Sequence, residues 1–179
     1  MDYQDIIDFW FLECEPAQWF QKSDSFDNLI RQRFGKIHQQ ARLGECFTWR
    51  NSIDGRLAEI IVLDQFSRHI YRNTAQAFAQ DMQALTLAQE AVAQGIDQKL
   101  ECIERSFLYM PYMHSESVAV HQEAERLYKS LNKEDNYNFE LKHKAIIERF
   151  GRYPHRNALL GRKSTNEELD FLKHSESSF

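Results

Sequence analysis

The scarcity of helix-breaking residues is the feature that most constrains how this chain can fold. Only six glycines and three prolines occur among its 179 residues. Few breakers favour long helices over an architecture of short strands joined by many turns. Hydrophobic residues make up 42% of the chain, which argues against a disordered protein. We therefore expect one all-α domain over residues 1–179.

Apolar residues recur at helical spacing along most of the chain, and capping residues divide them into helices. The expected helices cover residues 2–12, 23–43, 54–71, 74 or 81 to 95, 97–110, 115–131 and 139–150, with a short final helix that begins at Ser164 or Thr165. Asp54 is expected to cap the third helix. Pro111 is expected to bend or end the fifth. The last residues, 174–179, are expected to fray.

One face of the third expected helix runs from apolar residues into a charged pair. Leu57, Ile61, Asp64 and Arg68 follow one another at steps of four, three and four, which places them on one face. A solvent-facing pair at this spacing would contribute about 0.3–0.5 kcal/mol. An acid that far into an apolar face needs a partner, so we favour a partly buried pair at a pocket wall.

A short stretch without charge, residues 107–113, is bracketed by charged side chains. It is too short to span a membrane and is therefore expected in a core. Arg105 and Tyr109 share a helix face there. His114 and Glu116 follow the stretch, and Glu116 is expected either in a pocket or in the first turn of the sixth helix.

Basic residues concentrate in one C-terminal segment. Between residues 140 and 163 seven bases stand against two acids, although the whole chain carries a net charge of -5. His143 lies there on a face with Phe139, Ile146 and Phe150. Arginine suits bidentate binding of a carboxylate or phosphate. The segment can equally be a solvated basic face or a set of arginines paired with internal acids.

Two proline-containing segments, residues 110–116 and 149–156, are expected to converge on a ligand site. The acids nearest in sequence, Glu116 and Glu148, are fewer than the arginines, so positive charge is left over. A small anion or the acidic end of a peptide is the simplest complement. The ligand-binding residues expected from these arguments are Asp64, Arg68, Arg105, Tyr109, His114, Glu116, His143, Arg149, Arg152, His155 and Arg156.

Two classes of function follow from these residues. The first is a binding module with an Arg/His-rich pocket. The second is a small soluble enzyme in which His114 or His155 acts as general acid and base and Glu116 or Asp64 orients it. An open groove would favour the first and a closed cavity the second. A purely structural scaffold is a third possibility, and it would need the polar groups to be paired only with one another.

Other classes are disfavoured by what the sequence lacks. The acidic balance argues against nucleic acid. Three widely spaced cysteines and an acidic N-terminus without a basic signal region predict free thiols in the cytoplasm. No phosphate-binding loop, dinucleotide fingerprint or nucleophile elbow occurs, so no cofactor is predicted. His114 and Glu116 with His143 or His155 have no diagnostic metal spacing, so no metal site is predicted.

Four motifs carry a family resemblance. They are LDQFSRHIYR at residues 63–72, AFAQD at 77–81, FLYMPYMHSE at 107–116 and IIERFGRYPHRNALLGRKST at 146–165. In this order they resemble the bacterial family known as domain of unknown function 924, over nearly the whole chain. Ser67 and His69 stand where that family has proline and asparagine, and Tyr112 and Tyr153 where it has leucine and phenylalanine.

The resemblance implies a fold and no established reaction. The implied fold has about eight helices packed as antiparallel pairs in a right-handed superhelix, similar to tetratricopeptide-repeat proteins. The sequence itself shows no clear repeat of about 34 residues, so the superhelix is an expectation from the resemblance alone.

Overall fold

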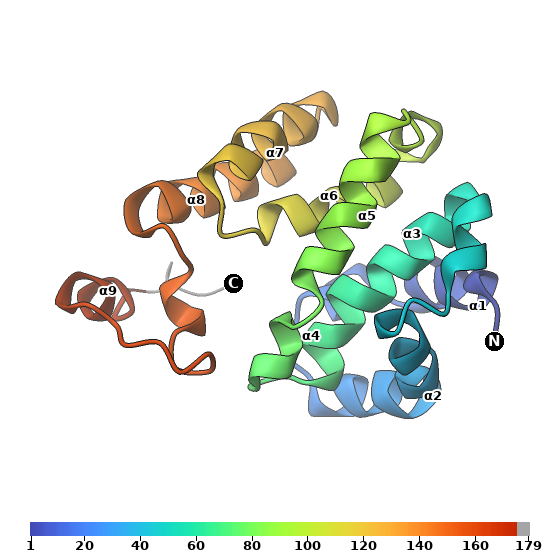
Figure 1. The fold of residues 1–179 in the computed structure, drawn as a ribbon, viewed down its shortest axis with the longest axis horizontal. Coiled ribbons are helices and arrows are strands. Elements are labelled where there is room, and N and C mark those ends of the chain that lie inside the picture. Colours follow the sequence, from blue (N-terminus) through green and yellow to red (C-terminus); the bar gives the residue numbers. More distant parts are fainter. Residues whose placement is uncertain (175–179) are drawn as a thin grey trace. The chain divides into compact units, whose positions relative to one another are not determined.

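The chain is all-α in the computed structural model, which describes residues 1–174 (Figure 1). Its α-helices are α1 (Tyr3–Asp8), α2 (Asp24–Arg42), α3 (Ile53–Ile61), α4 (Ser67–Ile70), α5 (Asp81–Ala93), α6 (Cys102–Met113), α7 (Val118–Ser130), α8 (Glu134–Phe150) and α9 (Asn166–Phe171). No strand occurs within residues 1–174. The expected all-α class is confirmed, and the right-handed superhelix stays a prediction. Of the end expected to fray, residues 175–179 lie outside the described part.

The chain divides into two compact units. The first comprises residues 1–72 and 76–111, and the second comprises residues 73–75 and 112–179. The division falls within α6, between Pro111 and Tyr112. A single domain over the whole chain stays a prediction.

The first unit has an aromatic core. Helix α1 packs on α3, α2 on α4, and α3 on α5. The ring of Phe9 lies 4.6 Å from that of Phe34, and the ring of Trp10 lies 5.6 Å from that of Phe107. These four side chains are at most 2% exposed. Burying such large side chains supplies much of the driving force for folding this unit.

Most helix ends lie where local signals place them. Ser23 caps α2 through its side chain, and Gly44 follows that helix with a φ of 77°. Thr165 and Glu168 form the capping box of α9. One cap was predicted wrongly: Ser52, not Asp54, is the N-cap of α3, because its hydroxyl accepts from the backbone N–H of Gly55.

Two features of the helices differ from the expectation. The expected third helix is interrupted by a π-helical turn, Val62–Phe66, between α3 and α4. Pro111 lies inside α6, which continues to Met113 instead of ending at Met110. A proline removes one hydrogen bond from the ladder, and so close to the C-terminus the residues after it still complete the last turn.

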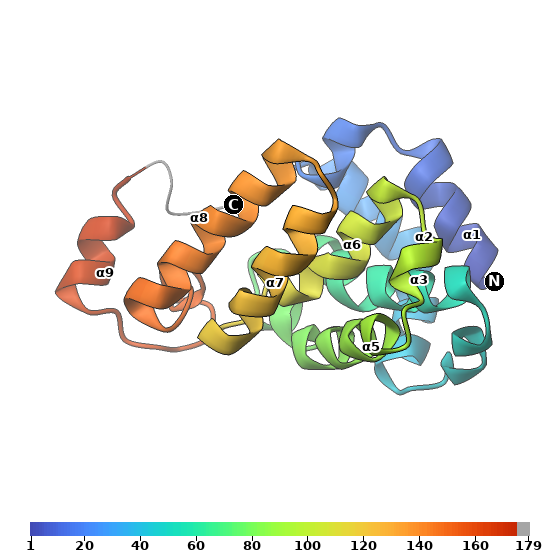
Figure 2. The ribbon, with the colours of Figure 1, turned by 90° about the horizontal axis from the view of Figure 1, so that it is seen from above.

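The second unit contains α7 and α8, which pack side by side (Figure 2). Helix α8 begins five residues before Phe139, and its buried side chains are Glu140, His143, Ile146 and Ile147. Phe139 is 53% exposed. The predicted face is right at His143 and Ile146 and wrong at Phe139, because Glu140 is buried in place of its neighbour Phe139.

Candidate functional site

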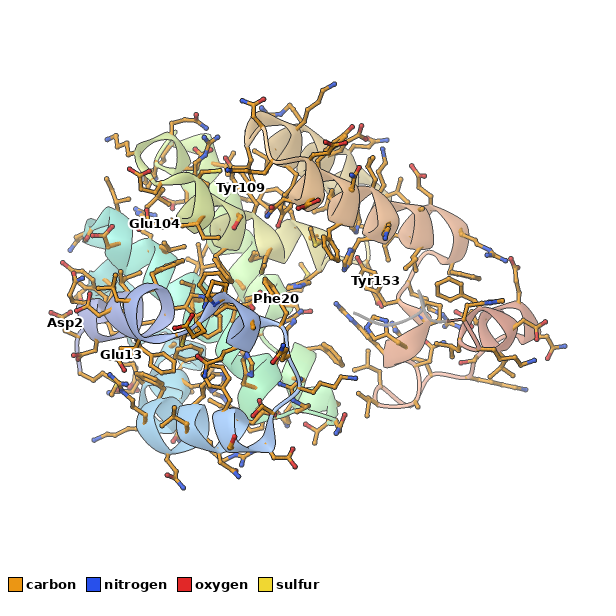
Figure 3. All side chains as sticks on the ribbon, turned by 180° about the vertical axis from the view of Figure 1, so that it is seen from behind. Asp2, Glu13, Phe20, Glu104, Tyr109 and Tyr153 are labelled. Carbon is orange, nitrogen blue, oxygen red and sulfur yellow. The ribbon has the colours of Figure 1, made fainter. Side chains whose placement is uncertain are left out.

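Tyr153, labelled in Figure 3, lies in the second unit between the end of α8 and a short 3-10 turn. Gly151 ends α8 in the left-handed conformation, with a φ of 68°. Pro154 then begins a 3-10 turn, where its missing N–H costs no helical bond. Between the two, Tyr153 is turned inward and is 1% exposed. A glycine stop and a proline start thus place one aromatic ring in the interior.

Tyr153 connects the two segments that were expected to converge. Its backbone N–H donates to Oε1 of Glu116 at 2.8 Å. Its hydroxyl donates to the carbonyl oxygen of Met113 at 2.5 Å. The expected contact between residues 110–116 and 149–156 is therefore present at these residues.

Histidine and arginine side chains surround the Tyr153 ring. The rings of His121, His143 and His155 lie 6.4, 5.8 and 5.5 Å from it, centroid to centroid. The guanidinium carbon of Arg156 lies 4.5 Å from the ring centroid. A planar guanidinium over an aromatic face is attracted by the ring quadrupole. Cationic and titratable groups from α7, α8 and the 153–156 turn thus meet at one ring, which we call the Tyr153 cluster.

The protonation of His143 is opposed by burial and by the neighbouring histidines. Burial lowers the pKa of His143 to about 3, and the charges of His114, His121 and His155 act in the same direction. The carbonyl oxygen of Phe139, 2.8 Å from Nδ1, offsets only part of this effect. His143 is therefore held neutral, as an N–H donor to its own helix.

A buried histidine–glutamate pair belongs to the same cluster. His121 and Glu140 are both 0% exposed. Nδ1 of His121 lies 2.7 Å from Oε1 of Glu140, and Nε2 lies 2.9 Å from the carbonyl oxygen of Ser115. Burial raises the pKa of Glu140, against the hydrogen bond from His121. This pair was not predicted, although Glu140 shares a helix face with His143 and Ile147 at steps of three and four.

Glu116 is not in the first turn of α7, which begins at Val118; this expectation was wrong. Its carboxylate instead accepts two hydrogen bonds from Arg162, at 2.6 and 2.9 Å, beside the one from the Tyr153 N–H. Burial raises the pKa of Glu116, but Arg162, the Tyr153 N–H and Arg156 outweigh it and leave the pKa lowered. Glu116 thus orients Arg162 and the Tyr153 amide. A role in orienting His114 or His155 stays a prediction.

Two of the expected anion-binding arginines have carboxylate partners in the last helix. Arg149 pairs with Glu167 at 2.8 Å, and both side chains are more than half exposed. Arg152 pairs with Glu168 at 2.6 Å and holds the pKa of that carboxyl down at about 2. The prediction that these two arginines lack carboxylate partners was wrong, because it considered only the acids nearest in sequence. Their role in binding a ligand stays a prediction.

Four of the expected residues, Asp64, Arg68, Arg105 and Tyr109, form contacts within the first unit. Asp64 is 1% exposed, and its Oδ1 lies 3.1 Å from Nη1 of Arg68. Arg68 also pairs with Asp81 at 2.9 Å. Arg105 donates to the Tyr109 hydroxyl at 3.2 and 3.3 Å (Tyr109 is labelled in Figure 3). The expected Asp64–Arg68 and Arg105–Tyr109 neighbours are therefore in contact, and their part in a ligand site stays a prediction.

Residues 1–174 contain neither a candidate metal site nor a candidate membrane-spanning helix. No group of three or more His, Cys, Asp or Glu side chains is placed to hold a metal ion in this part of the chain. Within the same residues, none of the helices has both the length and the apolar character needed to cross a membrane.

Comparison with known proteins places the whole chain in one group. The model of a family described as "Bacterial protein of unknown function (DUF924)" matches residues 6–176. A solved structure of a protein of unknown function from Agrobacterium tumefaciens is similar, with 38% identity, a TM-score of 0.91 and 96% of each chain covered. No curated protein matches the sequence.

Proposed function

The chain belongs to the DUF924 family of bacterial proteins of unknown function, and from this premise we propose that it is a binding protein for a small anion or the acidic end of a peptide. The observation that carries the proposal is the Tyr153 cluster, in which three histidine rings and the Arg156 guanidinium surround one buried ring. Four potential cationic groups at one place form a centre that a negative ligand would complement.

Two acids of the second unit, Glu116 and Glu140, already have hydrogen-bond donors, and this supports the proposal. The two oxygens of Glu116 accept from Arg162 and from the Tyr153 amide. Glu140 is held by His121. Each of these carboxylates therefore already has a strong donor, whereas His143 is kept neutral by burial and by the charges of its neighbours. A bound anion would act against burial and the neighbouring positive charges, because it favours the protonated form of the histidines.

Arg156 is the side chain on which recognition would depend most. It is 6% exposed, and its guanidinium is stacked on Tyr153. Stacking limits the rotation of the guanidinium plane, so less entropy is lost when it binds a carboxylate or phosphate with two parallel hydrogen bonds. His114 and His155 are half-buried, so they can be reached from solvent. The proposed ligand would contact Arg156 and these two histidines.

The test is a comparison of anions at matched ionic strength. Phosphate or sulfate should raise the melting temperature of the wild-type protein more than chloride does, and more at pH 6 than at pH 8, because binding is linked to histidine protonation. Arg156→Gln should abolish the difference between phosphate and chloride. Arg126→Gln is the matched control, since Arg126 is exposed and paired with Glu123.

Two results would contradict the proposal. One is an equal shift with chloride, which would mean that only ionic strength acts on the protein. The other is an equal loss of the phosphate effect in Arg126→Gln and Arg156→Gln, which would mean that Arg156 binds the anion no better than an exposed arginine does.

A further inference from the structure

We propose that His121 and Glu140 form a binding site for one shared proton, and that this proton decides which acceptor the Tyr153 hydroxyl uses. The proposal goes beyond anion binding and does not depend on it. It rests on the geometry of the hydrogen bonds around the two buried side chains, taken in turn below.

Both nitrogens of the His121 ring face oxygen atoms. Nδ1 is 2.7 Å from a carboxylate oxygen of Glu140, and Nε2 is 2.9 Å from the carbonyl oxygen of Ser115. A neutral imidazole has a single N–H and can satisfy only one of these acceptors. The second contact requires one more proton, carried either by the ring or by Glu140. The two forms differ only in where that proton lies along the Nδ1–Oε1 line.

The environment of Glu140 favours keeping the proton. The pair is 0% exposed, so a carboxylate there has lost its water. Within residues 1–174, Oε2 of Glu140 is buried and has no hydrogen-bond partner, which an ionised carboxylate tolerates poorly. In the second unit the charged groups that act on Glu140 are His121 and Lys144, which favour ionisation, and Glu125, which opposes it.

Other titratable groups of the second unit lie next to the pair. His114 and His155, like His121 itself, act electrostatically on His143, the buried neighbour of Glu140 on α8. The Tyr153 hydroxyl comes closest to the pair, with its oxygen 3.3 Å from Nε2 of His121. This hydroxyl has only one proton to donate, so its acceptor depends on what Nε2 carries.

Loss of one proton from the pair therefore changes two hydrogen bonds. With the proton present, Nε2–H donates to Ser115 and the Tyr153 hydroxyl donates to Met113. The protonated pair holds two protons, one between Nδ1 and Oε1 and one on Nε2. When one of them leaves to solvent, the one that remains lies on Nδ1 towards the Glu140 carboxylate, so Nε2 has lost its proton and becomes an acceptor. The Tyr153 hydroxyl then turns from the Met113 carbonyl to Nε2. Residues 113–115, which carry His114, lose two of their links to the cluster.

The experiment is a pH titration of the full chain by NMR, with histidine nitrogens and backbone amides labelled. Loss of the proton from His121 should coincide with a shift of the His114 amide, whose peptide bond contains the Met113 carbonyl. In Glu140→Gln the side-chain NH₂ can donate to Nδ1 without an ionisable proton. The step in the His121 nitrogen signals and the step in the His114 amide signal should therefore both disappear. Glu125→Gln, which changes a carboxylate that acts on Glu140 from a distance, should keep both steps.

A second variant keeps the test decisive if Glu140→Gln does not fold. Tyr153→Phe lacks the hydroxyl, so its His121 step should persist while the coincident step of the His114 amide is lost. The proposal is overturned if the His114 amide steps equally in the wild type and in Tyr153→Phe, or if His121 titrates unchanged in a folded Glu140→Gln. Neither result depends on phosphate, so failure of this inference is distinguishable from failure of the anion-binding proposal.

Discussion

The Nε2 atom of His38 lies 2.8 Å from the hydroxyl oxygen of Ser67, and that hydroxyl donates its own proton to the carbonyl oxygen of Leu63. Ser67 has only one proton, so His38 must be the donor of the first bond. This polarity is opposite to that of a serine nucleophile and its base. The pair therefore anchors α2 to α4 within the first unit, and His38 is a neutral buried side chain.

His38 should make the protein less stable in acid. Burial lowers its pKa to about 4, below the usual value of about 6.5. As the pH falls between these values, the unfolded chain takes up a proton that the folded chain does not, so the free energy of unfolding should fall by about 3 kcal/mol. Denaturant melts from pH 7 to pH 4 should show a shallower decline for His38→Asn than for the wild type. An equal decline would contradict this, and exposed His174→Gln is the control.

Asp64 and Arg68 should be strongly coupled in stability. Asp64 is 1% exposed, so Arg68→Ala would leave a buried carboxylate without that cation and should cost about 3–5 kcal/mol. Melts of Asp64→Ala, Arg68→Ala and the double variant measure the coupling. The exposed pair Asp170 and Lys173 is the control and should give under about 1 kcal/mol. Additive losses of a few tenths at Asp64 and Arg68 would refute the coupling.

Two glycines should respond oppositely to alanine. A Cβ at Gly55 would lie 2.2 Å from the carbonyl oxygen of Trp49, so Gly55→Ala should lower the free energy of unfolding by about 1–3 kcal/mol or more. At Gly35, inside α2, no atom lies within 4 Å of the added methyl group in the described structure. Gly35→Ala should therefore stabilise the protein by up to about 1 kcal/mol, through helix propensity. Equal effects of the two substitutions in denaturant melts would mean that the Trp49 carbonyl moves away from the added methyl group at little cost.

The three cysteines should differ in reactivity. Burial raises the pKa of Cys14 to about 12 and that of Cys46 to about 11, so neither forms an appreciable thiolate near neutral pH. Cys102 is only half-buried. A thiol reagent at pH 8 should therefore modify one cysteine quickly and the other two at the rate of unfolding. Cys102→Ser should lack the fast phase, and a fast phase that persists would show that Cys14 or Cys46 opens locally.

The features that could be predicted from the sequence are those with local causes. The ends of α2 and α8 are set by contacts within a few residues, so spacing alone reveals them at Ser23, Gly44 and Gly151. The capping box of Thr165 and Glu168 is local in the same sense. Helix class and most helix ends therefore followed from neighbouring residues.

The features that could not be predicted depend on partners distant in the chain. Glu167 and Glu168 pair with arginines 18 and 16 residues earlier, across a turn whose path no spacing reveals. Glu140 had the helical spacing of a core residue, but an acid is expected on the solvent side unless its partner is known. That partner is His121, 19 residues earlier on another helix. The buried acid could be recognised only once α7 and α8 were seen together.

The π-helical turn Val62–Phe66 makes the length of this segment as important as its residue types. Removing one residue from it would rotate everything that follows by about 100° around the helix axis. This single change would separate three side-chain pairs of the first unit: Ser67 from His38, His69 from Asp27, and Arg72 from Asp27. Among descendants of a common gene, this stretch should therefore accumulate substitutions but neither gain nor lose a codon.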